Sequence, residues 1–216
     1  MRYYIADLHF FHNGLNNRMD HRGFSTLETM HQYMIDRWNY RVRRNDEVII
    51  LGDFSIGKAK ETEEILKQLN GKKYLITGNH DKFLQDKKFD TSLFKWIKPY
   101  AELNDNKRKV ILCHYPIMCY NGQFRRNEEQ IPTTWMLHGH IHNTPDCVTV
   151  EAYKDFVRQY PRASRQCDEP IPAPVQMINC FCMASDYIPL TLDEWIELEN
   201  KGLLKDMVRE EWKYDK

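Results

Sequence analysis

The sequence lacks three features that would point to an exported or membrane-bound protein. No stretch approaches the roughly 18 apolar residues that a membrane-spanning helix needs. The apolar run at residues 2–5 is too short for a secretory signal. None of the six cysteines forms a CxxC pair, and Cys180 and Cys182 lie in an apolar run. We therefore expect a cytoplasmic protein with reduced thiols.

An excess of charge of either sign is also missing. The 31 basic and 31 acidic residues give a formal net charge of zero. This balance argues against nucleic acid or an anionic membrane as the main partner, because both attract proteins with a broad basic face. The 216 residues contain no repeat, low-complexity run or clear linker. We expect a single domain over residues 1–216.

The first 80 residues alternate between short apolar strands and amphipathic helices. Strands are predicted at residues 2–6, 47–51 and 73–77, and helices after Ser25 and over 59–70. Ser25 and Glu28 have the spacing of a capping box. The next apolar residues fall on one helical face: Leu27, Met30, Met34, Ile35 and Trp38. A β-α-β-α-β order is typical of parallel strands joined by crossover helices.

The second half of the chain is predicted to contain more strands. We expect a hairpin formed by residues 95–103 and 107–113, then strands near 135–137 and 175–183. Residues 143–176 contain five prolines and a possible helix near 151–159, and they are interpreted as an irregular insertion or lid-like loop. Thr191 and Glu194 predict the start of a helix, and the apolar spacing at 203–212 predicts a docked C-terminal helix.

Polar side chains that can bind metals follow five of the predicted strands. They are Asp7, His9, Asp53, Asn79, His114, His140 and His142. In open α/β sheets, ligands gather at the carboxyl ends of strands. Residues two apart along a strand point the same way, so Asp7 and His9, like His140 and His142, are expected to aim at one place. Gly52, Gly78 and Gly139 would permit tight turns there.

Seven ligands are too many for one tetrahedral ion. They suit two ions about 3.5–4 Å apart if one carboxylate bridges them. Imidazole and carboxylate ligands are typical of manganese, iron or zinc. We therefore expect two metal ions per chain, with Mn²⁺, Fe²⁺/Fe³⁺ and Zn²⁺ as candidates.

The order of these motifs resembles that of the calcineurin-like metallophosphoesterase superfamily. The matching segments are Asp7-Leu8-His9, Gly52-Asp53, Gly78-Asn79-His80-Asp81, His114 and Gly139-His140-Ile141-His142. The resemblance implies an α/β (α+β, four-layer) fold in which a two-sheet mixed β-sandwich is flanked by helices. It implies that Asp7, His9 and His142 hold one metal and that Asn79, His114 and His140 hold the second. Asp53 would bridge the two.

The function implied is hydrolysis of a phosphodiester or a nucleotide-like phosphate ester by a metal-bridging hydroxide. His80 is not needed as a ligand, and we assign it as general acid or as a donor to the developing phosphorane charge. Asp81 either fixes the tautomer of His80 or caps a turn. His12 and Asn13 follow the first motif and are candidates for substrate contact. Arg125 and Arg126 are either phosphate-binding or solvated surface residues.

Other functions are compatible with the same motifs. A phosphomonoesterase or protein phosphatase would use the same site, although the chain has no long docking extension. A nuclease is disfavoured by the zero net charge. A non-catalytic scaffold is disfavoured because all seven ligands and His80 are present. The expected partner is a small-molecule phosphoester, and the sequence does not indicate an oligomeric state.

Overall fold

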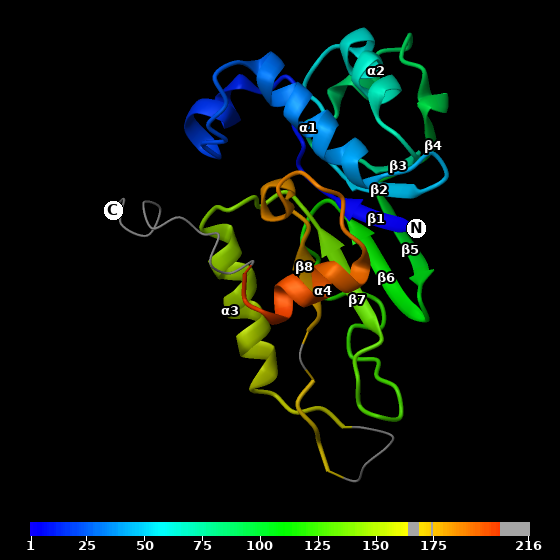
Figure 1. Cartoon of the computed structure of the whole chain (residues 1–216). Coiled ribbons are helices and arrows are strands. Elements are labelled where there is room, and N and C mark those ends of the chain that lie inside the picture. Colours follow the sequence, from blue (N-terminus) through cyan, green and yellow to red (C-terminus); the bar gives the residue numbers. More distant parts are fainter. Residues whose placement is uncertain (164–168, 174, 204–216) are drawn as a thin grey trace.

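A computed structural model describes residues 1–163, 169–173 and 175–203 of the chain (Figure 1). The described residues form two four-stranded sheets and four α-helices, together with short helical turns. The turns are η1 (Leu15–Met19), η2 (Lys82–Gln85), η3 (Thr91–Leu93) and η4 (Cys182–Ser185). None of the helices in this described part is long and apolar enough to span a bilayer.

The first sheet confirms the predicted β-α-β-α-β order. Its strands are β1 (Arg2–Ile5), β2 (Glu47–Leu51), β3 (Lys72–Ile76) and β4 (Phe94–Lys98). They lie in this order, and every neighbouring pair is parallel. The crossovers from β1 to β2 and from β2 to β3 contain α1 (Leu27–Arg41) and α2 (Ala59–Gln68). The carboxyl ends of β1, β2 and β3 therefore meet at one edge of the sheet.

The second sheet is mixed. Its strands are β5 (Tyr100–Asp105), β6 (Arg108–Cys113), β7 (Thr134–His138) and β8 (Met177–Asn179), in that order. The β5–β6 hairpin is antiparallel, whereas β6, β7 and β8 are parallel to one another. The hairpin turns at Asn106 and Lys107, which both have positive φ angles. The last strand is shorter than the predicted range 175–183, since the chain leaves the sheet after Asn179.

The prediction of one strand over residues 95–103 is wrong, because this segment forms two strands that belong to different sheets. β4 pairs with β3 in the first sheet, and β5 pairs with β6 in the second. Pro99 separates them. Proline has no backbone N–H for a ladder, and it is therefore a suitable residue for the passage from one sheet to the next.

The two sheets and their helices form four layers (Figure 1). Alternate residues of a strand belong to different cores: Tyr3 and Ile5 of β1 pack with α1 and α2, whereas Tyr4 packs toward the second sheet. In the second sheet, Leu112 faces the first sheet and Ile111 packs with α3. Both faces of the central strands are thus buried, which explains their continuous apolar sequence. The predicted helix-flanked two-sheet sandwich is confirmed.

The described part of the region 143–176 contains more regular structure than predicted. It begins with α3 (Asp146–Arg158), which starts well before the predicted helix near 151–159. Cys147, Val150 and Val157 of this helix pack into the core on the outer face of the second sheet. The first part of the predicted insertion is therefore a structural layer. The predicted C-terminal helix lies mostly outside the described residues, which end at Leu203.

Two helix caps were predicted, and one needs correction. α1 is capped by Thr26 and Thr29 in a reciprocal pair, not by Ser25 and Glu28. The cap lies one residue later because the Thr29 hydroxyl accepts a bond from the Thr26 N–H. The predicted cap of α4 (Leu192–Asn200) by Thr191 and Glu194 is confirmed.

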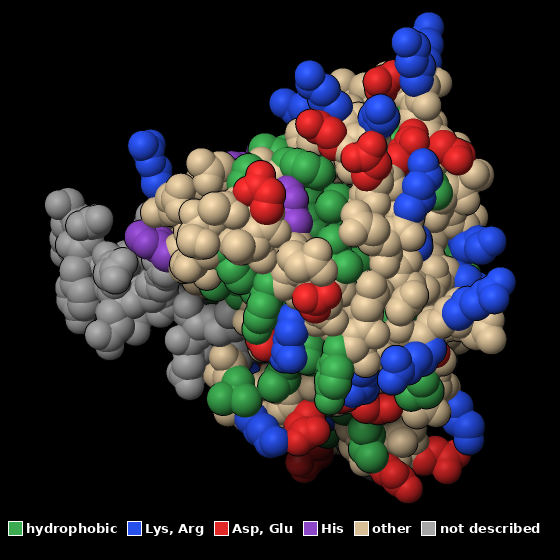
Figure 2. Space-filling view, turned by 45° about the horizontal axis from the view of Figure 1, so that its top comes forward, with side chains coloured by type: hydrophobic (Ala, Val, Ile, Leu, Met, Phe, Trp, Pro, Cys, Tyr) green, Lys and Arg blue, Asp and Glu red, His purple; other side chains and the backbone are tan. Residues whose placement is uncertain are grey.

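The surface carries charges of both signs in mixture. Figure 2 shows Lys and Arg side chains interspersed with Asp and Glu on the face that it presents. The described residues of this face form no continuous basic stripe of the kind that follows a nucleic-acid backbone. This mixture agrees with the formal net charge of zero.

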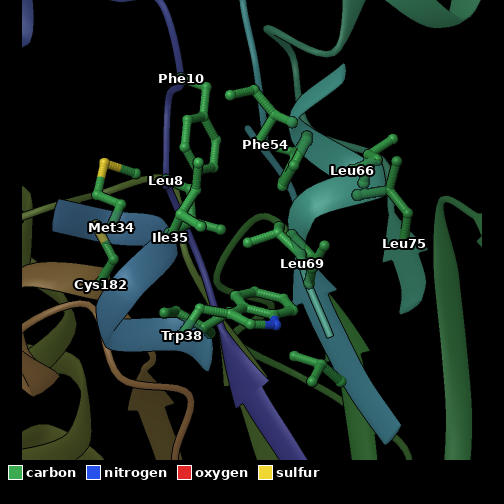
Figure 3. Close-up of a cluster of buried hydrophobic side chains, with 14 of the residues drawn as sticks. Leu8, Phe10, Met34, Ile35, Trp38, Phe54, Leu66, Leu69, Leu75 and Cys182 are labelled. Carbon is green, nitrogen blue, oxygen red and sulfur yellow. The ribbon is translucent and has the colours of Figure 1, made fainter. Parts of the chain in front are cut away.

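The core beneath α1 and α2 supports the carboxyl ends of β1 and β2. Trp38 is 1% exposed, and its indole N–H donates to the Asn70 carbonyl at 3.0 Å. Leu69 packs beside it, and Leu8 and Phe54 lie in the same cluster (Figure 3). Leu8 and Phe54 each adjoin a predicted metal ligand, Asp7 or Asp53. This packing holds the first two motifs on a rigid support.

Candidate metal centre

Most of the predicted ligands lie just beyond the ends of strands, on backbone with a left-handed conformation. The φ angles are 58° at Asp7, 51° at His9, 52° at Asp53, 72° at His140 and 45° at His142. Such angles are uncommon outside glycine and cost about 1–3 kcal/mol each when strained. We expected Asp7 and His9, like His140 and His142, to aim at one place because residues two apart on a strand point the same way. That reason is wrong. Alternation applies to extended backbone, and here turns direct the side chains.

The three motif glycines make room for the ligands. A Cβ atom at Gly78 would lie 2.1 Å from Asp53 Oδ1, and one at Gly139 would lie 2.6 Å from Asp7 Oδ2. At Gly52 it would lie 2.3 Å from His114 Nδ1, and Gly52 also has a φ of +89°. Each space is filled by a carboxylate or an imidazole. These close approaches confirm that the glycines lie beside the cluster.

The ligand atoms converge from both sheets. Two sets of three buried residues each bring one ligand atom per residue within 4.8 Å of one another: Asp7, His9 and His142, and Asp7, Asp53 and His114. His9 Nε2 lies 3.1 Å from His142 Nε2. Asp53 Oδ2 lies 3.3 Å from His9 Nε2 and 3.5 Å from His114 Nε2. Asp53 therefore lies between the two halves of the cluster.

The remaining two predicted ligands lie at its open side. Asn79 Oδ1 is 3.1 Å from His114 Nε2, and Asn79 itself is exposed. The half-buried His140 ring lies 5.1 Å from the His114 ring, centroid to centroid. The His140 backbone N–H donates to both oxygens of Asp7, at 3.0 and 3.1 Å. All seven predicted ligands thus lie in or beside one cluster.

The spacing fits ligands that surround metal ions. Two ligand atoms about 2.1 Å from one ion are roughly 3.0–3.4 Å apart at bond angles between 90° and the tetrahedral value. The distances of 3.1, 3.3 and 3.5 Å around His9, Asp53 and His114 lie close to this range. Imidazole, carboxylate and amide ligands are of the kinds that manganese, iron and zinc accept. The residues present therefore fit two such ions.

Burial shapes the charge at the cluster. Asp7 is 0% exposed, and burial raises the pKa of its carboxyl. Burial also lowers the pKa of His9 far below its ordinary value, which leaves this imidazole neutral with a lone pair. Burial opposes a charge on His142 as well, but Asp7 and Asp20 together raise its pKa. The neighbouring carboxylates thus favour positive charge at a place from which water is largely excluded, and a bound metal ion would supply that charge.

His114 is held in one orientation. Its Nδ1 lies 2.8 Å from the Leu51 carbonyl, so Nδ1 carries the proton and Nε2 faces Asp53 and Asn79. Burial disfavours the imidazolium, but the carboxylates of Asp53 and Asp7 raise the pKa of His114 to about 9. A backbone carbonyl that fixes the tautomer in this way is a common partner of metal-binding histidines.

Of the two roles considered for Asp81, the structure favours the turn cap over orientation of the His80 ring. Its Oδ2 accepts from the N–H groups of Gly78 at 2.8 Å and Asp53 at 3.0 Å, and its Oδ1 accepts from Phe54 N–H at 2.7 Å. Both oxygens are thus used on backbone, and neither is bonded to His80. Burial raises the pKa of Asp81 to about 6, against the effect of these bonds. Asp81 ties the second motif to the third and does not orient the His80 ring.

His80 and His12 lie together at the open side of the cluster. The His80 N–H donates to Asp53 Oδ1 at 2.8 Å, and its ring centroid lies 5.2 Å from that of His9. The His12 ring lies 5.5 Å from His9 and 6.1 Å from His80, and its Nδ1 accepts from the Leu15 N–H. Asn13 is exposed and accepts from Asn17 at 3.1 Å. His12 therefore borders the cluster, whereas Asn13 lies on the loop beside it.

Arg125 and Arg126 are not brought to the cluster. The Arg125 carbonyl accepts from Thr133 N–H, and Arg126 bonds to the carbonyls of Gln130 and Pro172. Thr133 precedes β7, whereas His140 follows its other end. Five residues of extended strand, about 3.3 Å each, separate these ends. Both arginines line a separate cavity of about 880 Å³ near the end of α3.

Sequence reasoning missed three residues of the site. Asp20 bonds to His142, and Arg22 bonds to Asp20 and to the backbone of the first motif. Both residues belong to a loop with no periodic pattern, so the sequence did not indicate the direction of their side chains. Tyr115 is 46% exposed, and its ring lies 4.5 Å from that of His140. Its position directly after His114 was the available signal.

Comparisons with known proteins agree with this geometry. The family described as calcineurin-like phosphoesterase matches residues 3–177. An uncharacterized protein of Methanocaldococcus jannaschii is 32% identical over 202 residues, which cover 93% of this chain and 92% of that protein. A crystal structure of a protein of unknown function from Aquifex aeolicus has a TM-score of 0.59 at 22% identity. It covers 92% of this chain and 98% of its own, and it bears on the fold alone.

Proposed function

Because the chain belongs to the calcineurin-like phosphoesterase family, we propose that it is a dinuclear metal-dependent phosphoesterase that hydrolyses a small phosphodiester or nucleotide-like ester. The observation that carries this proposal is the position of Asp53. Its Oδ2 lies 3.3 Å from His9 Nε2 in one half of the cluster and 3.5 Å from His114 Nε2 in the other. A carboxylate between two sets of ligands is what a pair of ions about 3.5–4 Å apart requires.

Each ion has a set of residues that would hold it. Asp7, His9 and His142 would hold the first ion, and Asn79, His114 and His140 the second, with Asp53 shared. Two bound cations neutralise phosphate oxygens and lower the pKa of a shared water, so that a nucleophile is available near neutral pH. The protein supplies buried carboxylates, which attract the cations, and left-handed turns, which direct these carboxylates toward the cluster.

His80 is the residue that we propose acts on the leaving group. Its backbone N–H holds Asp53, so its ring stays at the open side without being needed as a ligand. From there it would donate a proton to the departing oxygen, or a hydrogen bond to the charge that develops on phosphorus. His12, which lies beside His80 on the same side of His9, would contact the ester through its Nε2–H, because its Nδ1 accepts from the Leu15 N–H.

A diester is favoured by the charge at the open side. Arg22 lies against the cluster, but it is 8% exposed and its donors are used on Asp20 and on the carbonyls of Asp7 and Leu8. The substrate-facing groups that border His9 are imidazoles, His12 and His80. A singly charged diester needs less positive charge from the protein than a doubly charged monoester does.

The test compares two chromogenic substrates. Purified protein is incubated with Mn²⁺ and either bis-p-nitrophenyl phosphate or p-nitrophenyl phosphate, with and without a chelator, and its metal content is measured. We expect faster hydrolysis of the diester, loss of activity with chelator and recovery on adding Mn²⁺. Faster hydrolysis of the monoester would make the protein a phosphomonoesterase. Metal binding without hydrolysis of either ester or of a panel of phosphorylated metabolites would favour the scaffold alternative.

A further inference from the structure

A buried arginine lies beneath the first motif. The Arg22 guanidinium donates from Nη1 to the Leu8 carbonyl at 2.6 Å and from Nη2 to the Asp7 carbonyl at 2.9 Å. Its Nε and Nη2 also donate to Asp20 Oδ2, at 3.0 and 2.9 Å, so that one carboxylate oxygen accepts both bonds of this ion pair. The guanidinium carbon lies over the Tyr187 ring, 5.7 Å from its centre. Arg22 thus connects its own loop to the backbone of Asp7 and Leu8.

Asp20 extends this connection to the fourth motif. Its Oδ1 lies 2.8 Å from His142 Nδ1, while its Oδ2 is held by Arg22. Asp20 is 1% exposed, and His142 is 7% exposed. An ionised carboxylate can only accept, so His142 Nδ1 carries the proton. The lone pair of the neutral ring is then on Nε2, which faces His9 Nε2 at 3.1 Å.

We propose that Asp20 and Arg22 are positioning residues that preform the Asp7–His9–His142 half of the centre by fixing the His142 tautomer and the Asp7–Leu8 backbone. This inference rests on the proposed metal-dependent function. Asp7 and His9 both have left-handed φ angles, 58° and 51°, and such backbone persists only where its surroundings hold it. Arg22 holds it by two successive carbonyls, those of the Asp7–Leu8 and Leu8–His9 peptide units.

The cost of this pair supports the assignment. A buried ion pair contributes little net stability, because two charges must leave water to form it. An apolar pair of similar size would fill the same space. An apolar pair, however, cannot accept a hydrogen bond from His142 and donate hydrogen bonds to two carbonyls at once. Partners of this kind change metal affinity about 10–100-fold when they are removed from other metal sites.

The first experiment uses the metal-free protein. Long-range ¹H–¹⁵N spectra report which ring nitrogen of His142 carries the proton, at a pH where the ring is neutral. We expect Nδ1–H in the wild type and a shift toward Nε2–H in Asp20→Ala. A merely structural role for Asp20 would leave the tautomer unchanged. The same tautomer in a folded Asp20→Ala protein would overturn the proposal.

The second experiment measures metal affinity by competition with a chromophoric chelator. We expect Mn²⁺ or Zn²⁺ to bind about 10–100-fold more weakly to Asp20→Ala and to Arg22→Lys. Asp20→Asn, which keeps the size of the side chain, is expected to be intermediate and to remain folded if Asp20→Ala does not. The matched control is Asp186→Asn, since Asp186 pairs with Arg37 at the exposed surface. Affinity within twofold of the wild type in folded Asp20→Asn and Arg22→Lys would refute the positioning role.

These outcomes separate the two proposals. If the wild type binds metal but hydrolyses no phosphate ester, the proposed function fails while the affinity comparison still tests Asp20 and Arg22. If the wild type binds no metal, the proposed function fails and the tautomer measurement alone decides whether Asp20 orients His142. The expected tautomer shift in Asp20→Ala together with unchanged metal affinity would also overturn the proposal, because a positioning residue must affect how the ligands bind the metal.

Discussion

Replacing Gly78 by alanine should remove Asp53 from its place between the two halves of the cluster. A Cβ atom at this position would lie 2.1 Å from Asp53 Oδ1 and 2.3 Å from Asp53 N, whereas ordinary contact begins near 3.4 Å. These atoms must therefore move by more than 1 Å. One of them is backbone, which cannot rotate away as a flexible side chain can.

The displacement is large compared with the tolerance of the site. Asp53 Oδ2 lies 3.3 and 3.5 Å from its two histidine neighbours, so a movement of this size takes it out of reach of at least one of them. Misplacement by 1 Å costs about 100-fold in rate, or about 2.7 kcal/mol of transition-state stabilisation. Overpacking of the buried turn should also lower the free energy of unfolding by about 1–3 kcal/mol.

The assay for Gly78→Ala combines kcat/KM for the diester, metal affinity and thermal unfolding. We expect kcat/KM to fall about 100-fold, with weaker binding of both metals. The control is Gly202→Ala. A Cβ at Gly202 meets no described atom within 4 Å, and its φ of +73° makes the substitution strained, so it tests backbone strain without displacement of a ligand. Wild-type metal affinity and turnover in Gly78→Ala would refute the reasoning that this space is reserved for Asp53.

Three further predictions follow from the same structure. His80→Ala should lower turnover by about 100- to 10,000-fold while metal content stays at the wild-type level, and a variant that loses metal instead would reassign His80 as a ligand. Burial lowers the pKa of Lys73 to about 8 in the folded protein. Between pH 8 and 10.5 the unfolded chain therefore binds more protons than the folded protein does. Across this range the free energy of unfolding of the wild type, relative to that of Lys73→Met, should rise by about 2 kcal/mol in chemical denaturation. Equal pH dependence of the two proteins would contradict this assignment. Adding Mn²⁺ at about 100 times its Kd should stabilise the metal-free protein by about 2.7 kcal/mol in the same assay, and an unchanged unfolding midpoint would mean that the folded cluster does not bind the ion.

Several features of the fold were predictable because local sequence decides them. The apolar residues of β2 were recognised over their observed range, and Thr191 and Glu194 capped α4 as their spacing predicted. The split at Pro99 was not recognised, since both segments are β-forming and only tertiary contacts assign them to different sheets. The sequence left two roles open for Asp81 for a related reason. Its neighbour in sequence is His80, but its partners in space include Asp53 and Phe54.

The sequence by itself determined which side chains are available at the candidate site, because the kinds of candidate ligands, their order and their places after apolar strands can all be identified in the chain. The sequence also determined that glycines lie next to these residues in the chain. Only the tertiary structure decided how the ligands are aimed, since left-handed turns at Asp7, His9, His140 and His142 replace the alternation of an extended strand. Likewise, only the fold brought Asp20 and Arg22 beneath His142, 122 and 120 positions away along the chain. Contacts over such separations depend on the packing of two sheets, and no local pattern encodes them.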